Sequence, residues 1–394
     1  MGFQPSQKVF LSHLVIQRSK RPLFQLTLRH LSVDKTSESH LLPRLYVGPT
    51  QESALSLSQF LNDNNQIKSQ QVLLQEGTAL PLSANQAHYV TNVMRMLGPG
   101  RKKGRWTYDQ YEPCVRMFTQ TSEWVARLEA MDDLGQEPKR RRRKNNMESL
   151  TVLATCIAPL RDFSSQQQQH QGWLQPILCL APPKKKDRFQ WILEKSTELG
   201  MEGWLLVQTD RTDGTSSSGS RDYWRKGQAY VLEAAEQCER LSVPPVLVME
   251  EDSSSDSKEP NAPNTSLLSD DSAEGNTFSP LSLLLKFMED KKDTSLLICR
   301  ERSDSSTPIL KALETIRTRS TDENDNKASR HCCLVLVGPE GGWSPEEEAA
   351  FDDAAAKHSH IIWNVSLGDN VLRTDTAAVT AMAAFSLIHD NADM

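Results

Sequence analysis

Apolar positions follow a helical period in two segments of the chain. Residues 87–97 carry apolar side chains at i, i+3, i+4 and i+7, namely Val90, Val93, Met94 and Leu97. This spacing predicts a helix with one buried face. A second helix is predicted to start with Asp187 as its cap and to run to Leu199, where Gly200 ends it.

Short apolar runs predict strands in both halves of the chain. In the first half they cover residues 42–47, 114–119, 123–128 and 150–157, a pattern that suits a small β-barrel. In the second half they cover residues 177–181, 204–208, 296–299 and 333–337. These strands alternate with helical segments at 187–199, 223–240 and 376–388. The second half is therefore predicted as an α/β fold with a mainly parallel sheet covered on both faces.

Composition divides the chain further. We expect an N-terminal segment over residues 1–40, a barrel domain over 41–160, a Gln-rich linker over 161–175 and an α/β domain over 176–390. Residues 50–70 are rich in Ser, Gln and Asn and are predicted to be an inserted loop. The acidic insert 250–279 is predicted to be disordered. For the basic run 139–144, a solvated loop is favoured over a phosphate-binding segment.

Length and cysteine content narrow the class of protein. The 394 residues have room for two domains, and a hydrophobic content of 38% suggests that part of the chain is unstructured. No apolar run approaches the ~20 residues that span a bilayer. The seven cysteines include no C-x-x-C pair, which indicates reduced thiols and no zinc site.

The net charge of −6, taken alone, argues against a nucleic-acid partner. However, the stretch from Glu250 to Arg330 holds 17 acidic and 11 basic residues, so it accounts for the whole net charge. The rest of the chain is balanced, and a local basic face is compatible with it.

Residues 1–33 contain five basic residues and no Asp or Glu. Basic, acid-poor segments with scattered apolar residues resemble organellar transit peptides, and the apolar core of a secretory signal is absent. The pattern predicts a mitochondrial or plastid protein without choosing between the two. A disordered basic tail on a cytoplasmic protein is the alternative.

Two glycine turns follow strands near the C-terminus, and each leads into a helix. They are Gly338–Gly342 and the segment Leu367–Leu372. Such turns bring backbone amides to a ligand at the carboxyl ends of strands. Arg373 directly precedes a helix that Thr374 or Asp375 is expected to cap, where the helix dipole disfavours a cation. Arg373 is therefore predicted to hold an anion, with an ion pair to Asp369 or Asp375 as the alternative.

Together these turns are similar to the RsmE-type branch of the SPOUT methyltransferases. Further segments resemble that family in the same order along the chain. They are Lys195–Gly200, Glu233–Cys238 with Arg240, and His88 with Val93–Arg95. Asp375 departs from the family, which usually has Glu there. The resemblance covers roughly residues 43–48, 72–130, 150–250 and 295–390.

The resemblance implies a deep C-terminal trefoil knot that binds S-adenosylmethionine, a PUA-like N-terminal barrel and a homodimer. It also implies methylation at N3 of one uridine in small-subunit ribosomal RNA. Arg373 would stabilise the uracil anion, and the base would be Glu198 or solvent. The implied cofactor-binding residues are Leu336, Gly338, Pro339, Glu340, Gly341, Gly342, Leu367, Gly368, Val371, Leu372, Thr374 and Thr376. The implied RNA-binding residues are His88, Arg95, Lys185, Lys195 and Arg211.

Two alternatives stay open at this stage. One is a related SPOUT enzyme that modifies another RNA or another atom. The other is a ribosome-assembly factor that binds RNA and has lost catalysis. The intact glycine turns and Arg373 favour a catalytic protein.

Overall fold

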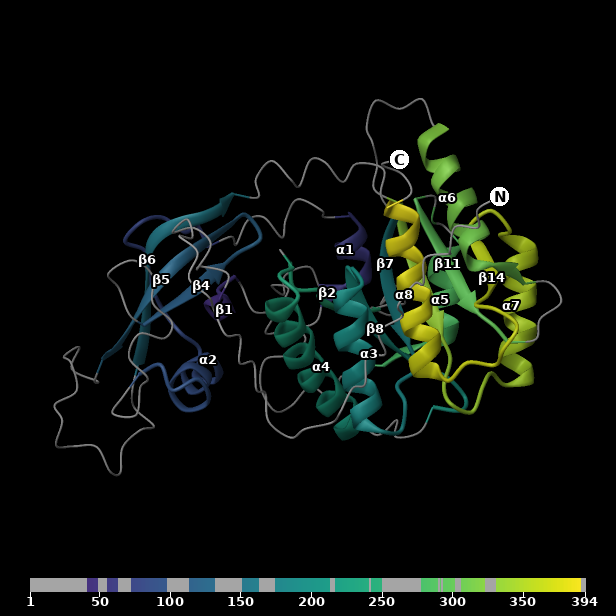
Figure 1. Cartoon of the computed structure of the whole chain (residues 1–394). Coiled ribbons are helices and arrows are strands. Elements are labelled where there is room, and N and C mark those ends of the chain that lie inside the picture. The colour runs from purple at the N-terminus through teal and green to yellow at the C-terminus, as the bar shows by residue number, and fades with distance from the viewer. Residues whose placement is uncertain are drawn as a thin grey trace, which may run out of the picture.

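The fold has two parts, a small N-terminal sheet and a large α/β domain (Figure 1). The computed structural model describes residues 41–48, 55–62, 72–97, 113–131, 151–162, 174–212, 217–240, 242–249, 278–289, 291, 293–301, 306–322 and 331–390. The segment 1–40, the basic run 139–144 and most of the linker 161–175 and of the insert 250–279 lie outside these residues. Phe278 and Ser279, predicted within the disordered insert, are in fact buried, and Ser279 begins a short strand.

The N-terminal sheet has five strands in the order β1-β4-β5-β6-β3. They are β1 (Arg44–Tyr46), β3 (Ala79–Pro81), β4 (Cys114–Phe118), β5 (Ser122–Met131) and β6 (Thr151–Asp162). The four strands predicted here are confirmed. The sheet curls, and the register of β5 against β6 shifts twice. Among the described residues no pairing joins β1 to β3, so closure into a PUA-like barrel stays a prediction.

The α-helix predicted over residues 87–97 is wrong beyond His88. Helix α2 (Ala84–His88) passes into a π-helical turn, η4 (Tyr89–Val93), closed by a bond from Met94 N–H to the Tyr89 carbonyl. A π-turn holds one more residue than an α-turn, so later side chains change face. Val93 is consequently 60% exposed, Met96 is buried, and Arg95 has a positive φ of 54°.

Residues 55–62 correct the loop predicted over 50–70. They form β2 (Leu55–Ser56) and α1 (Leu57–Asn62). Strand β2 pairs with β9 (Val246–Val248) of the large sheet, and the side chains of Leu57 and Phe60 are buried there. The Ser- and Gln-rich composition masked a short apolar motif in the sequence. Because its strand pairs with the large sheet, this segment belongs to the α/β domain and not to the first domain.

The large sheet follows the order β12-β14-β11-β13-β7-β8-β9-β2, and every pairing in it is parallel. Its remaining strands are β7 (Leu174–Leu180), β8 (Gly203–Gln208), β11 (Thr294–Cys299), β12 (Thr307–Pro308), β13 (His331–Val337) and β14 (Ile362–Ser366), and β10 (Ser279–Pro280) pairs with β8. The predicted α/β fold with a parallel sheet is confirmed.

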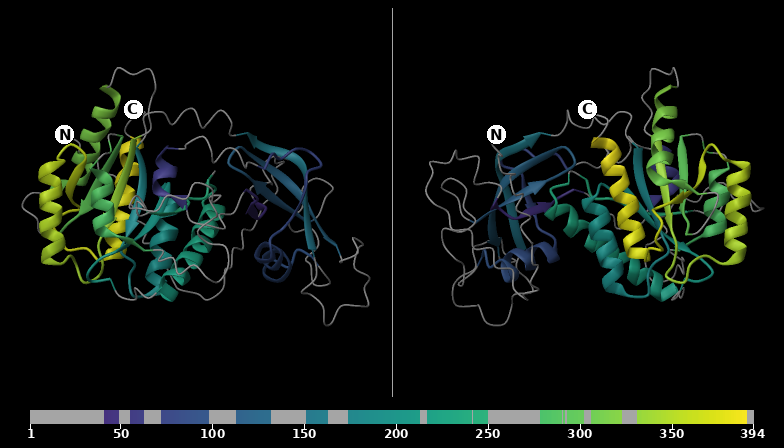
Figure 2. Two further views of the ribbon diagram at one scale, coloured as in Figure 1. Left: turned by 180° about the vertical axis from the view of Figure 1, so that it is seen from behind. Right: turned by 45° about the vertical axis from the view of Figure 1, so that its right-hand side comes forward.

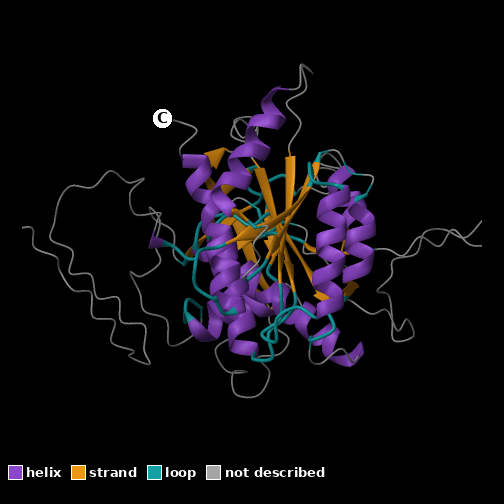
Figure 3. Ribbon diagram, turned by 90° about the vertical axis from the view of Figure 1, so that its right-hand side faces the viewer, coloured by secondary structure: helices purple, strands orange, loops and turns teal. Residues whose placement is uncertain are grey.

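Helices cover both faces of this sheet (Figure 3). One face carries α3 (Lys186–Glu198), α4 (Ser217–Gln237), α6 (Ile309–Asp322) and α8 (Thr374–Asp390). The other carries α1, α5 (Leu281–Met288) and α7 (Pro345–Lys357). Successive strand residues alternate between the two cores, as Val335 and Leu336 do, and that alternation requires apolar residues on both faces. Within the described residues no helix is long and apolar enough to cross a bilayer.

The predicted starts of three helices are corrected, and α4 begins at Ser217 instead of residue 223. Lys185 occupies the N-cap position of α3 without a side-chain cap, and Asp187 lies inside the first turn, where its charge suits the helix dipole. Helix α8 begins at Thr374, two residues earlier than predicted, because the Ala377 N–H already donates to the Arg373 carbonyl.

The last connection of the large domain crosses two strands. Strand β14 lies on the outer side of β11, whereas α8 packs against β7, β13 and α3. Residues 367–373 therefore pass over the carboxyl ends of β11 and β13. A threaded C-terminus needs such a crossing, and the trefoil knot itself stays a prediction.

A cluster of buried charges joins the N-terminal sheet to α4, which faces that sheet in all views (Figures 1 and 2). Glu123, fully buried, accepts from Arg44 Nε at 2.9 Å and also pairs with Arg116 and Arg161. Arg44 Nη1 donates to the carbonyls of Ala235 and Arg240, at 3.2 and 2.9 Å. Burial lowers the pKa of Arg44, and Glu123 opposes this effect. These bonds hold the N-terminal sheet against the α/β domain in one orientation.

Glu236 of α4 adds a pH-dependent contact to this junction. Its carboxylate accepts from Tyr46 N–H at 2.9 Å, and burial raises its pKa to about 7. In the unfolded chain the group ionises near pH 4.5, so the folded state loses relative stability as the pH rises from about 4.5 to 7.

We expect Glu236→Gln to remove that loss while keeping an acceptor for Tyr46 N–H. In urea unfolding, the variant should gain up to about 3 kcal/mol over the wild type between pH 4.5 and 7. A difference that does not vary with pH would contradict the raised pKa of Glu236.

Candidate active site

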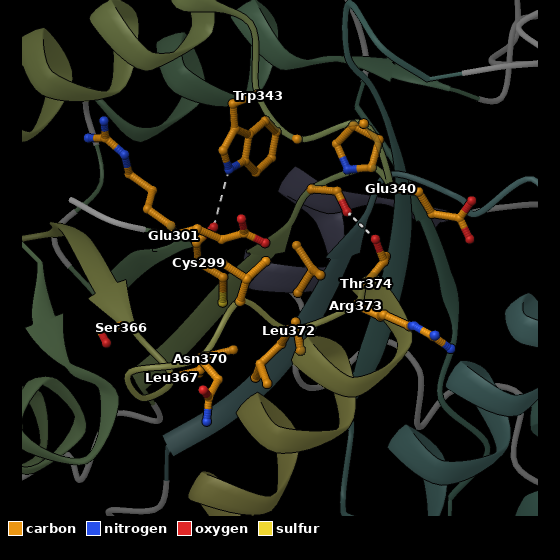
Figure 4. Close-up of a pocket in the computed structure, with 18 of the residues that line it drawn as sticks. Cys299, Glu301, Glu340, Trp343, Ser366, Leu367, Asn370, Leu372, Arg373 and Thr374 are labelled. Atoms are coloured by element: carbon orange, nitrogen blue, oxygen red, sulfur yellow. Dashed lines mark hydrogen bonds between the residues drawn. The ribbon is translucent and has the colours of Figure 1, made fainter.

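A cavity of about 660 Å³ opens at the carboxyl ends of β11, β13 and β14 (Figure 4). Both glycine turns line it, as predicted. The lining residues are Arg188, Arg211, Cys299, Arg300, Glu301, Val337, Gly338, Pro339, Glu340, Gly341, Gly342, Trp343, Glu348, Ser366, Leu367, Gly368, Asp369, Asn370, Val371, Leu372, Arg373, Thr374 and Ala377. Its position is that of ligand sites in parallel α/β sheets.

The first turn is shaped by glycine. Gly342 has a positive φ of 69°, and its N–H donates to the Pro339 carbonyl at 3.0 Å. The Trp343 ring lies over Gly338, its Nε1–H donates to the Cys299 carbonyl at 3.2 Å, and its edge contact with Phe351 holds it in place. The turn thus packs around an indole that leaves no room for a side chain at position 338.

Gly338→Ala should therefore distort this turn. A Cβ there would lie 2.8 Å from the Trp343 ring, and overpacking of this kind costs about 1–3 kcal/mol of unfolding free energy. Chemical denaturation of Gly338→Ala, Trp343→Ala and the double variant tests the clash. The loss of unfolding free energy caused by Gly338→Ala should largely vanish in the Trp343→Ala background. An equal loss in the wild-type and Trp343→Ala backgrounds would contradict the clash with the indole.

The first turn is also tied to the segment after β8. Glu347 at the start of α7 is buried and accepts from the backbone N–H groups of Ser344 and Asp210, at 2.8 and 2.9 Å. Next to Asp210, Arg211 Nη1 donates to the Gly341 carbonyl at 2.7 Å. This places the guanidinium of Arg211 at the cavity, beside the first turn.

The second turn is bonded directly to the first. Thr374 Oγ1 donates to the Gly338 carbonyl at 3.0 Å (Figure 4). Gly368 has a φ of 123°, and its N–H donates to Ser366 Oγ at 3.2 Å. The bond from Thr374 therefore joins two segments more than thirty residues apart into one cavity wall.

Arg373 lies at this junction, at the N-terminus of α8, and its side chain is exposed. Within the described residues it makes no ion pair, whereas Asp375 lies 3.8 Å from Arg188 Nε. Arg188 also donates to Glu340 Oε1 at 2.5 Å. The predicted alternative, an ion pair of Arg373 with Asp369 or Asp375, is thus wrong in this structure, and the guanidinium is available to a ligand.

The predicted site residues fall into two groups. Lining the cavity are Arg373, Arg211 and the cofactor candidates Gly338, Pro339, Glu340, Gly341, Gly342, Leu367, Gly368, Val371, Leu372 and Thr374. The structure does not bring the others there. Leu336 is buried in the sheet, Thr376 is exposed on α8, and His88 and Arg95 lie in the N-terminal part. Glu198 pairs with Lys195 at 2.6 Å near the end of α3, and Lys185 precedes that helix.

Several lining residues were missed by the sequence reasoning. Cys299 ends β11, and Arg300 and Glu301 follow it. The carboxyl end of a third strand is where ligand sites form, but only the position of β11 beside β13 brings these residues to the cavity. Arg300 is paired with Glu348 and Asp352 of α7. In the part of the chain that is described, no group of three or more His, Cys, Asp or Glu is arranged to hold a metal.

Fold and site define a parallel α/β domain whose ligand cavity is built from backbone turns at strand ends. The profile of a family described as "RNA methyltransferase domain" matches residues 173–302 and 276–386, together more than half of the chain. The chain belongs to this RNA methyltransferase family.

Curated relatives agree with this assignment. The Ribosomal RNA small subunit methyltransferase E of Mycobacterium bovis is 26% identical over 219 residues, which is 54% of this chain and 63% of that protein. The protein of the same name from Synechocystis is 28% identical over 241 residues, 61% of each chain. The chain thus spans less than two thirds of the length of these relatives. The RsmE resemblance seen in the sequence is confirmed.

Solved structures are similar to this chain, and the first of the two below shows the shared fold. A Legionella pneumophila protein in complex with S-adenosylmethionine matches 88% of this chain and 98% of its own, with a TM-score of 0.52 and 18% identity. The Ribosomal RNA small subunit methyltransferase E of Neisseria gonorrhoeae, bound to S-adenosylmethionine, also matches 88% of this chain and 98% of its own, with a TM-score of 0.48 and 18% identity.

Proposed function

We propose that this protein transfers a methyl group from S-adenosylmethionine to N3 of one uridine in small-subunit ribosomal RNA. The observation that carries the proposal is the junction of the two glycine turns at Thr374 and Gly338, with Arg373 beside it. A backbone-lined cavity and an adjacent cation that has no ion pair among the described residues are what a cofactor and an anionic acceptor need.

The residues present fit S-adenosylmethionine. The cavity volume lies within the range of about 300–1,000 Å³ for small-molecule sites. Glycines at 338, 341 and 342 let the backbone approach a ligand closely, and the partly buried Leu367 and Leu372 add apolar surface. Gly338–Gly342 and Leu367–Leu372 would hold the adenosyl and methionyl parts, and the cofactor would supply the methyl group.

Arg373 would act on the acceptor base. Uracil N3 must lose its proton to become a good nucleophile, and the resulting anion spreads onto the two carbonyl oxygens. Arginine cannot take that proton, because its pKa lies above ~12, but it stabilises the anion. Glu198 does not line the cavity of this chain, so of the two predicted bases solvent is the better supported.

The remaining expectations belong to the same proposal. RNA would dock on the N-terminal part near His88 and Arg95, and on Lys185, Lys195 and Arg211. The protein would act as a homodimer in ribosome maturation, in an organelle to which residues 1–40 direct it.

Calorimetric titration of the folded protein with S-adenosylmethionine tests the enzymatic proposal first. We expect saturable binding at one site per chain. Absence of binding by protein that is shown to be folded would favour an RNA-binding assembly factor without catalysis.

A further inference from the structure

We propose that Glu301 holds the ribose of the cofactor, its carboxylate accepting hydrogen bonds from the two ribose hydroxyls. This inference rests on the proposed function and adds a positioning residue to it. Glu301 lies two residues after the end of β11, lines the cavity and is exposed, and Figure 4 shows its carboxylate directed into the cavity beneath Trp343.

The position of Glu301 in the sheet carries the argument. Strand β11 is the immediate neighbour of β13, and the first glycine turn follows β13. An acidic residue in such a place, at the end of the strand next to a glycine turn, holds the ribose in dinucleotide-binding sheets. A sugar diol offers two O–H donors, and an ionised carboxylate offers two acceptor oxygens.

The Glu301 carboxylate is available to bind a ligand. Among the described residues it makes no ion pair or side-chain hydrogen bond, whereas Glu348 is held by Arg300 and Glu340 by Arg188. Asp369 is the other cavity carboxylate without an ion pair in the described residues, and it lies beyond Gly368 in the second turn. The test therefore includes both residues.

The experiment measures binding of S-adenosylhomocysteine and of its 2′-deoxy and 3′-deoxy analogues by calorimetry. The wild type should bind each deoxy analogue about 10- to 100-fold more weakly than the parent compound. Glu301→Ala should lose a similar factor for the parent compound and little more for the analogues. Glu314→Gln, an exposed carboxylate of α6 outside the cavity, should match the wild type.

The outcomes separate the two claims. If the wild type binds neither S-adenosylmethionine nor S-adenosylhomocysteine, the proposed function and the role of Glu301 both fall. If the wild type binds and Glu301→Ala distinguishes the analogues as the wild type does, only the role of Glu301 falls. A loss of that discrimination in Asp369→Asn instead of Glu301→Ala would also overturn it. Thermal unfolding of each variant confirms that the protein tested is folded.

Discussion

Arg373→Ala is expected to lower the single-turnover rate of RNA methylation by about 10²–10³-fold. Loss of one donor to a developing anion has an effect of this size, which corresponds to roughly 3–4 kcal/mol of transition-state stabilisation. The guanidinium lies at the N-terminus of α8 and makes no ion pair among the described residues, so its removal breaks no ion pair among them. Affinity for S-adenosylmethionine, measured separately, should change little.

Arg373→Lys is the matched control because it keeps the charge and loses the planar fork of donors. It should recover part of the rate lost in Arg373→Ala. An unchanged methylation rate in Arg373→Ala would show that the guanidinium does not act on the uracil anion. Equal losses in cofactor affinity and in rate would instead make Arg373 a cofactor-binding residue.

Glu123→Ala is expected to destabilise the protein by about 3–5 kcal/mol. Glu123 has no exposed surface and partners three arginines, of which Arg44 and Arg116 have side chains only 2% and 9% exposed. Removing one member of a buried ionic cluster leaves the other charges buried and uncompensated. The free energy of unfolding in guanidinium chloride measures this loss.

Glu129→Ala on the same strand is the control. Glu129 pairs with Arg127, and the two side chains are 40% and 36% exposed, so the change should cost less than about 1 kcal/mol. Similar costs for the two variants would refute the view that the junction depends on buried charge. Because Arg44 and Arg116 also contact α4 and the residues after it, Glu123→Ala should in addition loosen the N-terminal sheet from the α/β domain.

The glycine turns could be predicted because their signals are local. Strand, tight turn and helix follow one another within about ten residues around Gly338, and again around Gly368. Parallel strands then place both turns at one edge of the sheet. The bond from Thr374 to Gly338 could not be read from the sequence, because it depends on the order of strands in space.

Other features of the structure could not be predicted from the sequence, for related reasons. Arg188 contacts Glu340, 152 residues away, and no periodicity within either segment indicates that contact. Glu301 could be placed in the cavity only once β11 was known to lie beside β13, and the sequence does not show this neighbour relation. The π-helical turn at Tyr89–Val93 broke the regular period on which the helix prediction depended. The short motif Leu55–Leu61 was hidden by the polar composition around it.

The most direct test of the central claim is to map methyl groups on small-subunit ribosomal RNA from a strain that lacks this protein. The RNA is analysed before and after incubation with purified protein and S-adenosylmethionine. The proposed function predicts one new methyl group, on N3 of a single uridine, with the wild type and far less with Arg373→Ala. A methyl group on another atom or another RNA, or none with folded, cofactor-bound protein, would contradict it.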